Sequence, residues 1–354
     1  MSDILHSVPE TVLAGAFWSN LVRYTSSLVG GRCERWPNFV YIFRTATTMM
    51  SMRSLRTTLP VVWLCSASAA LSTQPVTLHV VQDSSAGTIS VLRGGSRDIV
   101  LVQNAQERIR PFLHPIMSPD GKGMLTEYRP SHHPHQTGVY WGLKATNGRD
   151  FFMACCVPGE QRYHRRVSAS VLQESGARVS WRTVYDLLDQ DGQTILVETK
   201  TWSIQEQTGK YLLDLEWRGD AKRAVTVDRF YVGGLFIRMP WRQGIAGEVI
   251  NAAGQRNNQA EQQRAIWADV GMAIEGRDDW GHIAILDHPD NTGFPIAWRV
   301  DAQLGVGPSR QILQDWRLTE GQSDVTRYRL VVYTGRLDPT VLHRAWTAYA
   351  SESR

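Results

Sequence analysis

The sequence predicts an all-β fold, a large antiparallel β-sandwich that ends in one helix. From Val76 onward, apolar and polar residues alternate with a period of two, as they do in strands that bury one face. Gly, Asp and Asn interrupt this alternation about every ten residues, which is the spacing of turns between antiparallel strands. A clear helical pattern occurs only near the C-terminus. Many strands without a repeat of fixed length favour one large sandwich.

Twelve segments carry the strand pattern. In chain order they are 76–81, 88–92, 99–103, 138–143, 167–173, 178–187, 194–205, 211–217, 235–239, 265–274, 282–286 and 328–333. Asp191-Gly192 and Thr208-Gly209 lie between neighbouring segments, as hairpins require. The C-terminal helix begins with Asp338 as N-cap and Pro339 at the first helical position, two strong start signals.

The chain divides into three parts. Residues 51–70 combine Arg53 and Arg56 with a short apolar run and several small residues, the pattern of a secretory signal peptide. The run is shorter than the roughly 20 apolar residues that span a bilayer, so we favour a cleaved signal over a permanent anchor. Residues 1–50 then form a non-native upstream extension, the alternative being a genuine amphipathic N-terminal region. Residues 75–354 are expected to form a single β-sandwich domain of a periplasmic or secreted protein.

Composition and charge exclude several classes of protein. With 42% hydrophobic and 20% charged residues, the chain is neither disordered nor collagen-like. The formal net charge is +4, but residues 1–72 hold six Arg against three acidic residues, so the remainder carries about +1. Such a chain lacks the concentrated Lys and Arg that nucleic acid requires. No apolar run after residue 75 approaches 18 residues, so we expect no stable membrane span in the mature chain.

The first candidate site is a histidine-rich segment, in which four of the ten histidines lie within 22 residues. In an extended chain His133 and His135 share one face, where two imidazoles can bind a divalent metal or act as an acid/base pair. His132 should then point to the opposite face. His114 is expected to bind substrate or join the metal ligands, and Glu127 is a candidate catalytic carboxylate. The alternative is a Pro-rich loop whose imidazoles satisfy local carbonyl groups.

The second candidate site lies where a predicted strand ends in Asp287 and His288. A carboxylate beside an imidazole, followed by Trp298 and Arg299, suits a polar ring-shaped ligand: Asp287 would be catalytic, and the other three would bind substrate. The alternative is a turn in which Asp287 caps its own loop. Arg238 follows a Gly-Gly turn and could either clamp a substrate anion or form a buried ion pair.

Several motifs occur in a recognisable order between about residues 76 and 335. They are Arg110-Pro-Phe-Leu-His114-Pro, His133-Pro-His135-Gln-x-Gly138, Asn147-Gly-x-Asp150-Phe, Gly233-Gly-Leu-x-x-Arg238, Trp267-x-Asp269 and Ile285-x-Asp287-His288-Pro-x-Asn291. This order resembles the bacterial PmoA-like family, a domain of unknown function. The family usually has a second adjacent His and an Arg where this chain has Gln136 and Thr137.

The resemblance implies an exported protein associated with bacterial polysaccharide use, with a sandwich similar to the galactose-mutarotase-like supersandwich. The family label also implies methane oxidation. The absence of long apolar runs after residue 75 argues against an integral membrane oxygenase, so we treat that label as a misnomer.

Three hypotheses for function follow. The first is a carbohydrate-active lyase, hydrolase or epimerase that acts on an oligosaccharide through the histidine and aspartate side chains. The second is a sugar-binding β-sandwich without catalysis. The third is a metal-dependent oxidative enzyme with a divalent metal at His133, His135 and His114. In each case the expected partner is a small molecule or an oligosaccharide.

Overall fold

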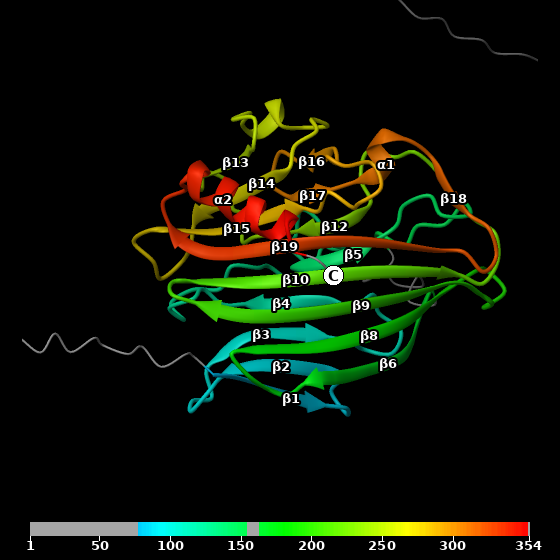
Figure 1. Ribbon diagram of the computed structural model, residues 1–354, viewed down its shortest axis with the longest axis horizontal. Helices are drawn as coiled ribbons and strands as arrows, with labels where there is room; N and C mark the ends of the chain where they lie inside the picture. Colours follow the sequence, from blue (N-terminus) through cyan, green and yellow to red (C-terminus); the bar gives the residue numbers. More distant parts are fainter. Residues whose placement is uncertain (1–76, 154–162, 353–354) are drawn as a thin grey trace, which may run out of the picture. The chain divides into compact units, whose positions relative to one another are not determined.

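Two antiparallel β-sheets stack as layers in the computed structural model, which describes residues 77–153 and 163–352 (Figure 1). A C-terminal helix lies outside the layers. The predicted all-β sandwich with a C-terminal helix is therefore confirmed. The predicted upstream extension, residues 1–50, and signal peptide, residues 51–70, lie outside the described residues, so export stays a prediction.

The first sheet has nine strands in the order β16-β17-β12-β5-β4-β3-β2-β1-β7. Its strands are β1 (Leu78–Asp83), β2 (Thr88–Arg93), β3 (Ile99–Asn104), β4 (Phe112–Ile116), β5 (Val139–Gly142), β7 (Ser175–Gly176), β12 (Gly234–Ile237), β16 (Trp298–Val300) and β17 (Val306–Pro308). Strands β1 to β5 form a meander of sequence neighbours. The chain returns to this sheet first with β7, which pairs with β1, and later with β12, which pairs with β5.

The second sheet has eight strands in the order β13-β14-β15-β19-β10-β9-β8-β6. Its strands are β6 (His164–Gln173), β8 (Arg178–Leu188), β9 (Thr194–Gln207), β10 (Lys210–Ala221), β13 (Gly247–Asn251), β14 (Trp267–Ala273), β15 (Trp280–Asp287) and β19 (Ser323–Gly335). A small separate sheet pairs β11 (Val225–Val227) with β18 (Trp316–Leu318). The helical segments are η1 (Asn257–Gln259), α1 (Arg310–Leu313) and α2 (Pro339–Ala350).

The hairpin between β9 and β10 shows how the turn residues set the register. Gln207 pairs with Lys210 across the two-residue turn Thr208-Gly209, and Gly209 has a φ of +73°. Glycine adopts this left-handed conformation at little cost, whereas a side chain would strain it. The predicted hairpin is confirmed here.

The main hydrophobic core fills the space between the two sheets, and the period-two pattern decides which side chains enter it. On β12, Leu235 and Ile237 belong to this core, while Phe236 belongs to a separate aromatic cluster on the outer face of the nine-stranded sheet. On β15, Ile283 points to the core, and Ala284 points to a third cluster beneath α2. Each sheet therefore has an inner face in the core and an outer face that is free to build a site.

Helix α2 covers part of the outer face of the eight-stranded sheet. The Asp338 carboxylate accepts hydrogen bonds from the amides of Thr340 (2.8 Å) and Val341 (3.3 Å), which confirms Asp338 as the N-cap. Leu342 and Tyr349 are buried against the sheet. In the described ranges, no helix has the length and apolar character needed to cross a bilayer.

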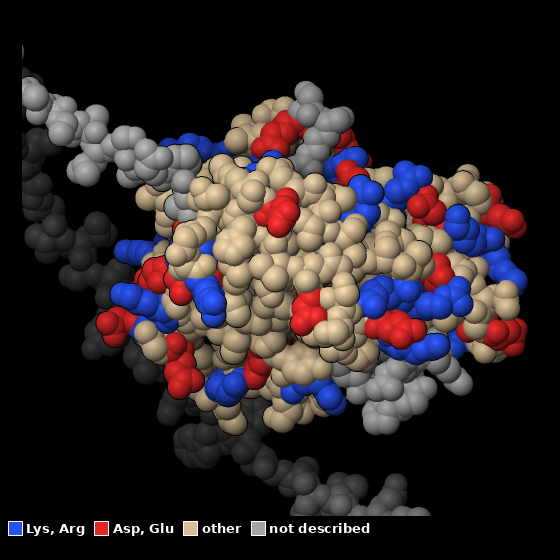
Figure 2. Space-filling view, turned by 90° about the horizontal axis from the view of Figure 1, so that it is seen from below, with Lys and Arg blue, Asp and Glu red and all other residues tan. Residues whose placement is uncertain are grey.

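The charged side chains are mixed in sign. On the face shown in Figure 2, Lys and Arg lie beside Asp and Glu along the rim, and uncharged residues occupy most of the middle. Many charged side chains of the described residues form ion pairs, as Arg165 does with Asp186 at 2.6 Å. Paired charges of this kind keep the surface close to neutral overall.

Candidate functional site

The histidine loop, residues 127–138, is the second part of the connection from β4 to β5 and folds back on itself. Tyr128 and Thr137 form an isolated antiparallel bridge near its base. Inside the loop, the amide of His133 donates to the carbonyl oxygen of Pro130 (2.9 Å), and the amide of Gln136 donates to that of His133 (3.0 Å). These are turns, so the segment is not extended as the sequence analysis assumed.

A glycine is required where the histidine loop enters β5. Gly138 has a φ of +71°, and a Cβ at this position would collide with the carbonyl oxygen of Leu113 on β4. Any other residue would therefore push the loop away from the sheet. The motif His133-Pro-His135-Gln-x-Gly138 thus combines the candidate side chains with the residue that lets them approach the sheet.

Three imidazoles form the centre of the site. His133 and His135 have ring centroids 5.7 Å apart, although the chain between them is not extended as the prediction of a shared face assumed. His132, which was expected to point away, also joins them: its Nδ1 lies 2.8 Å from Nδ1 of His133. That expectation was wrong because the backbone turns at Pro130–His133 and so brings successive side chains together.

The surroundings favour the neutral form of these rings. Burial lowers the pKa of His135 to about 4, and the nearby charge of Arg110 acts in the same direction. Burial also lowers the pKa of His133, helped by the charge of Arg238. Near pH 7 both rings are therefore neutral, and each can donate a proton from one nitrogen and accept one at the other.

His133 and His135 line a small cavity of about 70 Å³. Phe236 also lines it, and this places the cavity on the outer face of the nine-stranded sheet. Arg299 and Lys144 contribute charged groups to the wall. Apolar surface and a few polar groups on one cavity are typical of small-molecule sites.

The charged groups around the cavity are paired with one another. The pairs are Lys144 with Asp150, Arg299 with Glu261 at 2.6 Å, and Arg238 with Asp301 at 2.6 Å. Each cation that lines the cavity has its own carboxylate and the imidazoles are neutral, so the cavity wall carries little net charge. Such a site suits a neutral ligand rich in hydroxyl groups better than an anion.

Arg110 anchors the histidine loop through hydrogen bonds to its last residues. Its side chain is completely buried, and its Nη2 donates to the carbonyl oxygen of His135 (2.9 Å) and to the hydroxyl of Thr137 (3.3 Å). The guanidinium lies 3.7 Å from the centre of the Tyr140 ring, a cation–π contact. Arg110 therefore fixes the backbone at His135 and places a positive charge beside its ring.

Two residues predicted to bind substrate are buried elsewhere: Trp298 lies in the hydrophobic core, and His288 packs against helix α2. Trp298 is fully buried, and its Nε1 donates to the carbonyl oxygen of Ala265 (2.9 Å), so it cannot stack on a ligand. Arg299 faces the cavity because neighbouring residues of a strand point to opposite faces. His288 is buried with its ring against Tyr349 of α2. Both Trp298 and His288 were wrongly assigned to substrate binding.

Asp287 is likewise a structural residue. It is completely buried, and its carboxylate accepts hydrogen bonds from Nδ2 of Asn291 (2.8 Å) and from the amide of Ile296 (2.9 Å). Burial raises the pKa of Asp287 to about 7. The alternative interpretation, a carboxylate that caps its own loop, fits this geometry, and the catalytic assignment does not.

The remaining predicted residues surround the site without lining the cavity. Arg238 is fully buried and donates to Gln136 and to the carbonyl oxygen of Gln303 besides pairing with Asp301, so it forms a buried ion pair and cannot clamp a substrate anion. Glu127 pairs with Arg242 at 2.5 Å.

His114 lies on β4, where its Nδ1 is 3.1 Å from the hydroxyl of Thr126 and its ring stacks on Tyr128. Burial lowers the pKa of His114 to about 4. In the part of the chain that the structure describes, no three His, Cys, Asp or Glu side chains are grouped so that they could hold a metal ion. The structure thus does not assemble the proposed metal ligands His114, His133 and His135.

The sequence analysis missed most of the cavity wall. Lys144, Tyr231 and Asp301 come from three separate loops or strand ends, and no local pattern distinguishes them from ordinary surface residues. The sequence could have identified Asp150, since this residue belongs to the motif Asn147-Gly-x-Asp150-Phe. Its carboxylate caps the amides of Phe152 and Met153 (2.9 Å each), which orients the Phe152 ring toward the cavity.

Comparison with solved structures gives distant matches. An alpha-galactosidase from Geobacillus stearothermophilus shares 10% identity over 72% of this chain and 41% of its own, with a TM-score of 0.37. A galactose 1-epimerase from Lactobacillus acidophilus shares 8% identity over 73% of this chain and 98% of its own, with a TM-score of 0.37. A galactose mutarotase related enzyme from the same organism shares 6% identity over 72% and 97%, with a TM-score of 0.30.

Proteins of the mutarotase type that the sequence resemblance implied are thus among the matches. The chain spans about two fifths of the length of the alpha-galactosidase. At these TM-scores the likenesses carry no argument about activity, and the sandwich is shown by the two sheets themselves. No curated protein matches the sequence.

The comparison with family models corrects the family. The model that matches residues 88–347 is described as a family of unknown function, DUF6807, and nothing points to the PmoA-like family. The resemblance drawn from the motifs was therefore wrong in its family, although a domain of unknown function was expected. The match covers most of the chain and contains both the histidine loop and the cavity wall, so the chain belongs to the family of unknown function DUF6807.

Proposed function

We propose that the histidine site is the active site of a carbohydrate-active enzyme of the epimerase or lyase type. The observation that carries this proposal is the pair of neutral imidazoles, His133 and His135, whose rings lie 5.7 Å apart on one cavity. A neutral imidazole can take a proton from a sugar carbon or hydroxyl. A second neutral imidazole can donate a proton to another face of the same sugar. Epimerisation and elimination both need such an acid/base pair.

The ion pairs around the cavity argue against hydrolysis. Most glycoside hydrolases use two carboxyl groups, one of them free to protonate the leaving oxygen. Here Asp301 is held by Arg238, and Asp150 is held by Lys144 while its other oxygen accepts two amides. These carboxylates serve the structure of the site, which leaves the imidazoles as its acid/base groups.

The size of the cavity limits which part of a sugar can enter it. One water molecule needs roughly 10–15 Å³ of such a cavity. The volume of about 70 Å³ therefore holds about five water molecules. That is room for the edge of one sugar ring. We therefore expect the cavity to take one terminal sugar residue or a monosaccharide, with the rest of a longer chain outside.

The experiment is proton exchange in D₂O, followed by ¹H NMR. The full-length protein is mixed with neutral monosaccharides and oligosaccharides, and the spectra report anomer interconversion, deuterium incorporation at carbon and new vinyl protons. We expect one of these changes to proceed faster with the protein than without it. His133→Gln and His135→Gln should each slow it at least about tenfold, because removal of an acid/base group has this effect.

The matched control is His343→Gln, which makes the same change at an exposed histidine on α2. It should leave the exchange rate unchanged. If the wild-type protein binds a sugar but exchanges no proton with it, the enzyme proposal fails and the sugar-binding alternative replaces it.

A further inference from the structure

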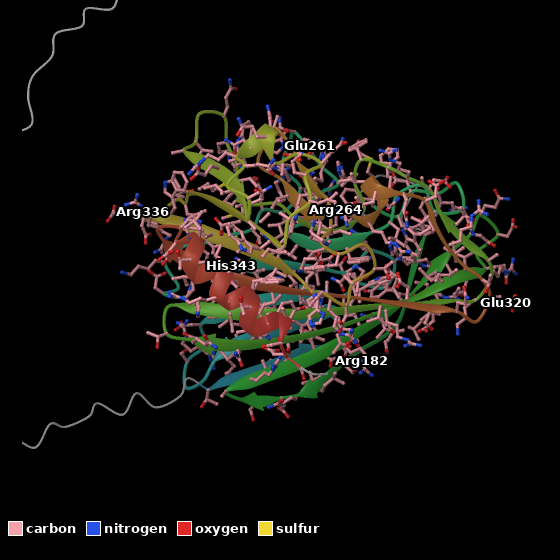
Figure 3. The ribbon with its side chains drawn as sticks, turned by 45° about the horizontal axis from the view of Figure 1, so that its top comes forward. Arg182, Glu261, Arg264, Glu320, Arg336 and His343 are labelled. Atoms are coloured by element: carbon pink, nitrogen blue, oxygen red, sulfur yellow. The ribbon has the colours of Figure 1, made fainter. Side chains whose placement is uncertain are left out.

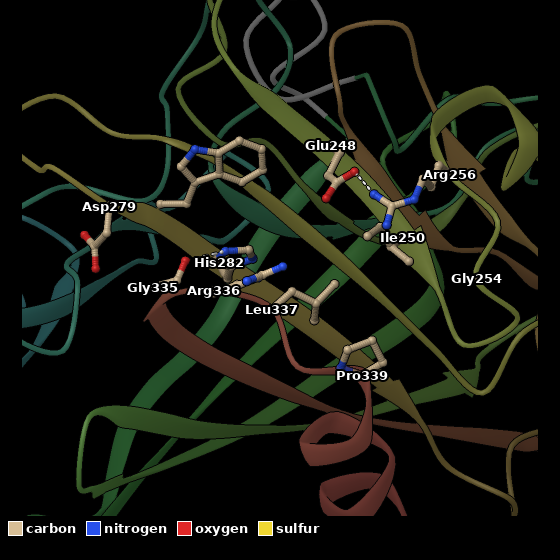
Figure 4. A pocket seen from close by; sticks show the side chains of 11 residues that line it. Glu248, Ile250, Gly254, Arg256, Asp279, His282, Gly335, Arg336, Leu337 and Pro339 are labelled. Carbon is tan, nitrogen blue, oxygen red and sulfur yellow. Dashed lines mark hydrogen bonds and ion pairs between the residues drawn. The ribbon is translucent and has the colours of Figure 1, made fainter. Parts of the chain in front are cut away.

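A second cleft lies on the outer face of the eight-stranded sheet, beyond the start of α2 (Figure 4). It has a volume of about 790 Å³, which is enough for a disaccharide. Figure 4 shows Glu248 and Arg256 on one side, Asp279 on the other, and His282 and Arg336 between them. The sequence analysis assigned no role to any of these residues.

The floor of the cleft is fixed by a buried hydrogen-bonded chain. Nδ1 of His282 lies 2.8 Å from the carboxylate of Asp269, and the hydroxyl of Tyr333 donates to the other oxygen of that carboxylate (2.9 Å). The His282 ring stacks on Tyr333 with centroids 4.7 Å apart. Nε2 of His282 lies 3.2 Å from the carbonyl oxygen of Gly335. A floor tied to three strands in this way is already formed before a ligand binds.

The walls combine apolar surface with one aromatic ring. Ile250, Leu337 and Pro339 supply apolar groups, and the half-buried Trp280 stands at the start of β15 with its ring 6.1 Å from that of His282. The C–H groups of a pyranose pack well on an indole face, while its hydroxyl groups reach the polar rim. The composition of the walls therefore fits a sugar ring.

The charges of the cleft leave one cation without a counter-charge. Glu248 pairs with Arg256, and Asp279 pairs with Arg277 at 2.7 Å. Among the residues that the structure describes, Arg336 has neither an ion pair nor a hydrogen bond from its side chain.

The nearest acidic residue in the sequence, Asp338, uses its carboxylate to cap α2. Arg336 can therefore receive a carboxylate from a ligand, and its planar guanidinium can bind both oxygens at once.

We propose that this cleft binds a sugar that carries a carboxylate, a hexuronic acid or its glycoside, with the ring on Trp280 and the carboxylate on Arg336. The proposal goes beyond the function proposed for the histidine site and does not depend on it. The two sites lie on the outer faces of different sheets, since the cavity contains Phe236 of β12 and the cleft contains His282 of β15.

Labelled side chains make the separation visible. Figure 3 shows Arg336 beside the start of α2 and well apart from Glu261, the partner of Arg299 at the histidine site. The histidine site prefers a neutral sugar and the cleft an acidic one. The two ligands can therefore bind independently. A protein with two such sites could hold an acidic polysaccharide at the cleft while it processes a neutral residue at the cavity.

The test is calorimetric titration of the full-length protein with two probes that differ only in the carboxylate. These are methyl β-glucuronide and methyl β-glucoside. We expect the glucuronide to bind at least about tenfold more tightly, as a charge-assisted, bidentate contact predicts. Acetate is the third probe and should compete only weakly, because it lacks the ring that Trp280 contacts.

Variants assign the binding to the cleft. Arg336→Gln should remove the preference for the glucuronide while the weak affinity for the glucoside stays, and Trp280→Ala should weaken both. The matched control Arg344→Gln changes an exposed arginine of α2 and should have no effect. His133→Gln should also leave glucuronide binding intact, so failure of the proposed enzyme activity and failure of this proposal can be told apart.

Three results would overturn the proposal. The first is equal affinity of the wild-type protein for the two glycosides, or binding of neither. The second is unchanged glucuronide binding in Arg336→Gln. The third is loss of glucuronide binding in His133→Gln, which would place the acidic sugar at the histidine site instead.

Discussion

Nη2 of Arg110 donates a 2.9 Å hydrogen bond to the carbonyl oxygen of His135, so a fully buried guanidinium holds the backbone of the histidine that reaches deepest into the site. Two other nitrogens of this guanidinium, Nε and Nη1, are buried without a hydrogen-bond partner in the described part of the chain. Burying these two nitrogens without hydrogen bonds costs free energy of folding. The charge of Arg110 also has a second effect on the site, because it opposes protonation of the His135 ring.

Replacing Arg110 should change the titration of His135. In Arg110→Met the charge is lost, so we expect the pKa of His135 to rise from about 4, though not to its ordinary value, because burial is the larger cause of the shift. Arg110→Lys keeps the charge and should keep the pKa low. The measurement is a ¹H–¹⁵N NMR titration of the ring. An unchanged pKa in Arg110→Met would mean that burial alone sets it.

The lowered pKa of His135 should also make the fold sensitive to acid. The pKa is about 4 in the folded protein and near 6.5 in the unfolded chain. As the pH falls below about 6.5, the unfolded chain binds a proton that the folded protein excludes, so acid favours unfolding. Between pH 6.5 and 4 this contribution reaches about 3 kcal/mol.

Asp287 acts in the opposite direction over an overlapping pH range, because its pKa is raised to about 7. The effect of His135 is therefore isolated by comparison with His135→Gln. Urea unfolding at pH 7 and pH 4.5 should show the wild-type protein losing more stability than this variant does. His343→Gln, measured in the same buffers, is the matched control. The prediction fails if both variants lose as much as the wild-type protein.

Asp287→Asn should weaken the fold and spare the histidine site. The carboxylate accepts one hydrogen bond at each oxygen, from Asn291 and from the amide of Ile296, whereas an amide side chain has only one oxygen. One buried donor then loses its acceptor, which costs about 1–3 kcal/mol. Urea unfolding at pH 8 measures the loss, and proton exchange with sugar should continue at the wild-type rate. Loss of exchange at unchanged stability would return Asp287 to a catalytic role.

The ion pair of Arg238 and Asp301 should show strong coupling. Arg238→Met leaves a buried carboxylate without its guanidinium, and we expect a loss of about 3–5 kcal/mol in the free energy of unfolding. In the double variant with Asp301→Asn no buried charge is left unpaired, so part of the stability should return. A double-mutant cycle from urea unfolding measures this. Simple additivity of the two single losses would contradict a buried pair.

Much of the fold could be predicted because long strands carry their own signal. All twelve predicted segments overlap strands of the structure, and β9 shows why: most of its 14 residues alternate between buried and half-buried positions. The strands that were missed are short: β4 and β13 have five residues each, β11, β16, β17 and β18 have three, and β7 has two. A period of two cannot be recognised in so few residues, and their pairing depends on neighbours that are distant in the sequence.

The candidate site was only partly predictable. His133 and His135 were found because histidines are concentrated in one segment and prolines flank them. Lys144 and Asp301 were missed because their role depends on meeting across the fold, and each alone resembles a surface charge. Asp287 was misassigned because a polar residue at the end of a strand can face either its own loop or a ligand, and sequence does not distinguish the two.

The position of β19 in the eight-stranded sheet has a consequence for how the protein is made. Strand β10 pairs with β9, its neighbour in sequence, on one edge and with β19 on the other, where Asp214 and Arg329 meet across 115 positions of the chain. A ribosome begins β19 at Ser323, about 100 residues after β10 ends at Ala221, which takes roughly 5–20 s at ordinary rates of synthesis. During that interval the second edge of β10 is an open template for other strands. Chains that end before Ser323 keep this edge permanently and are expected to aggregate, so the last strand protects the nascent protein as well as completing its sheet.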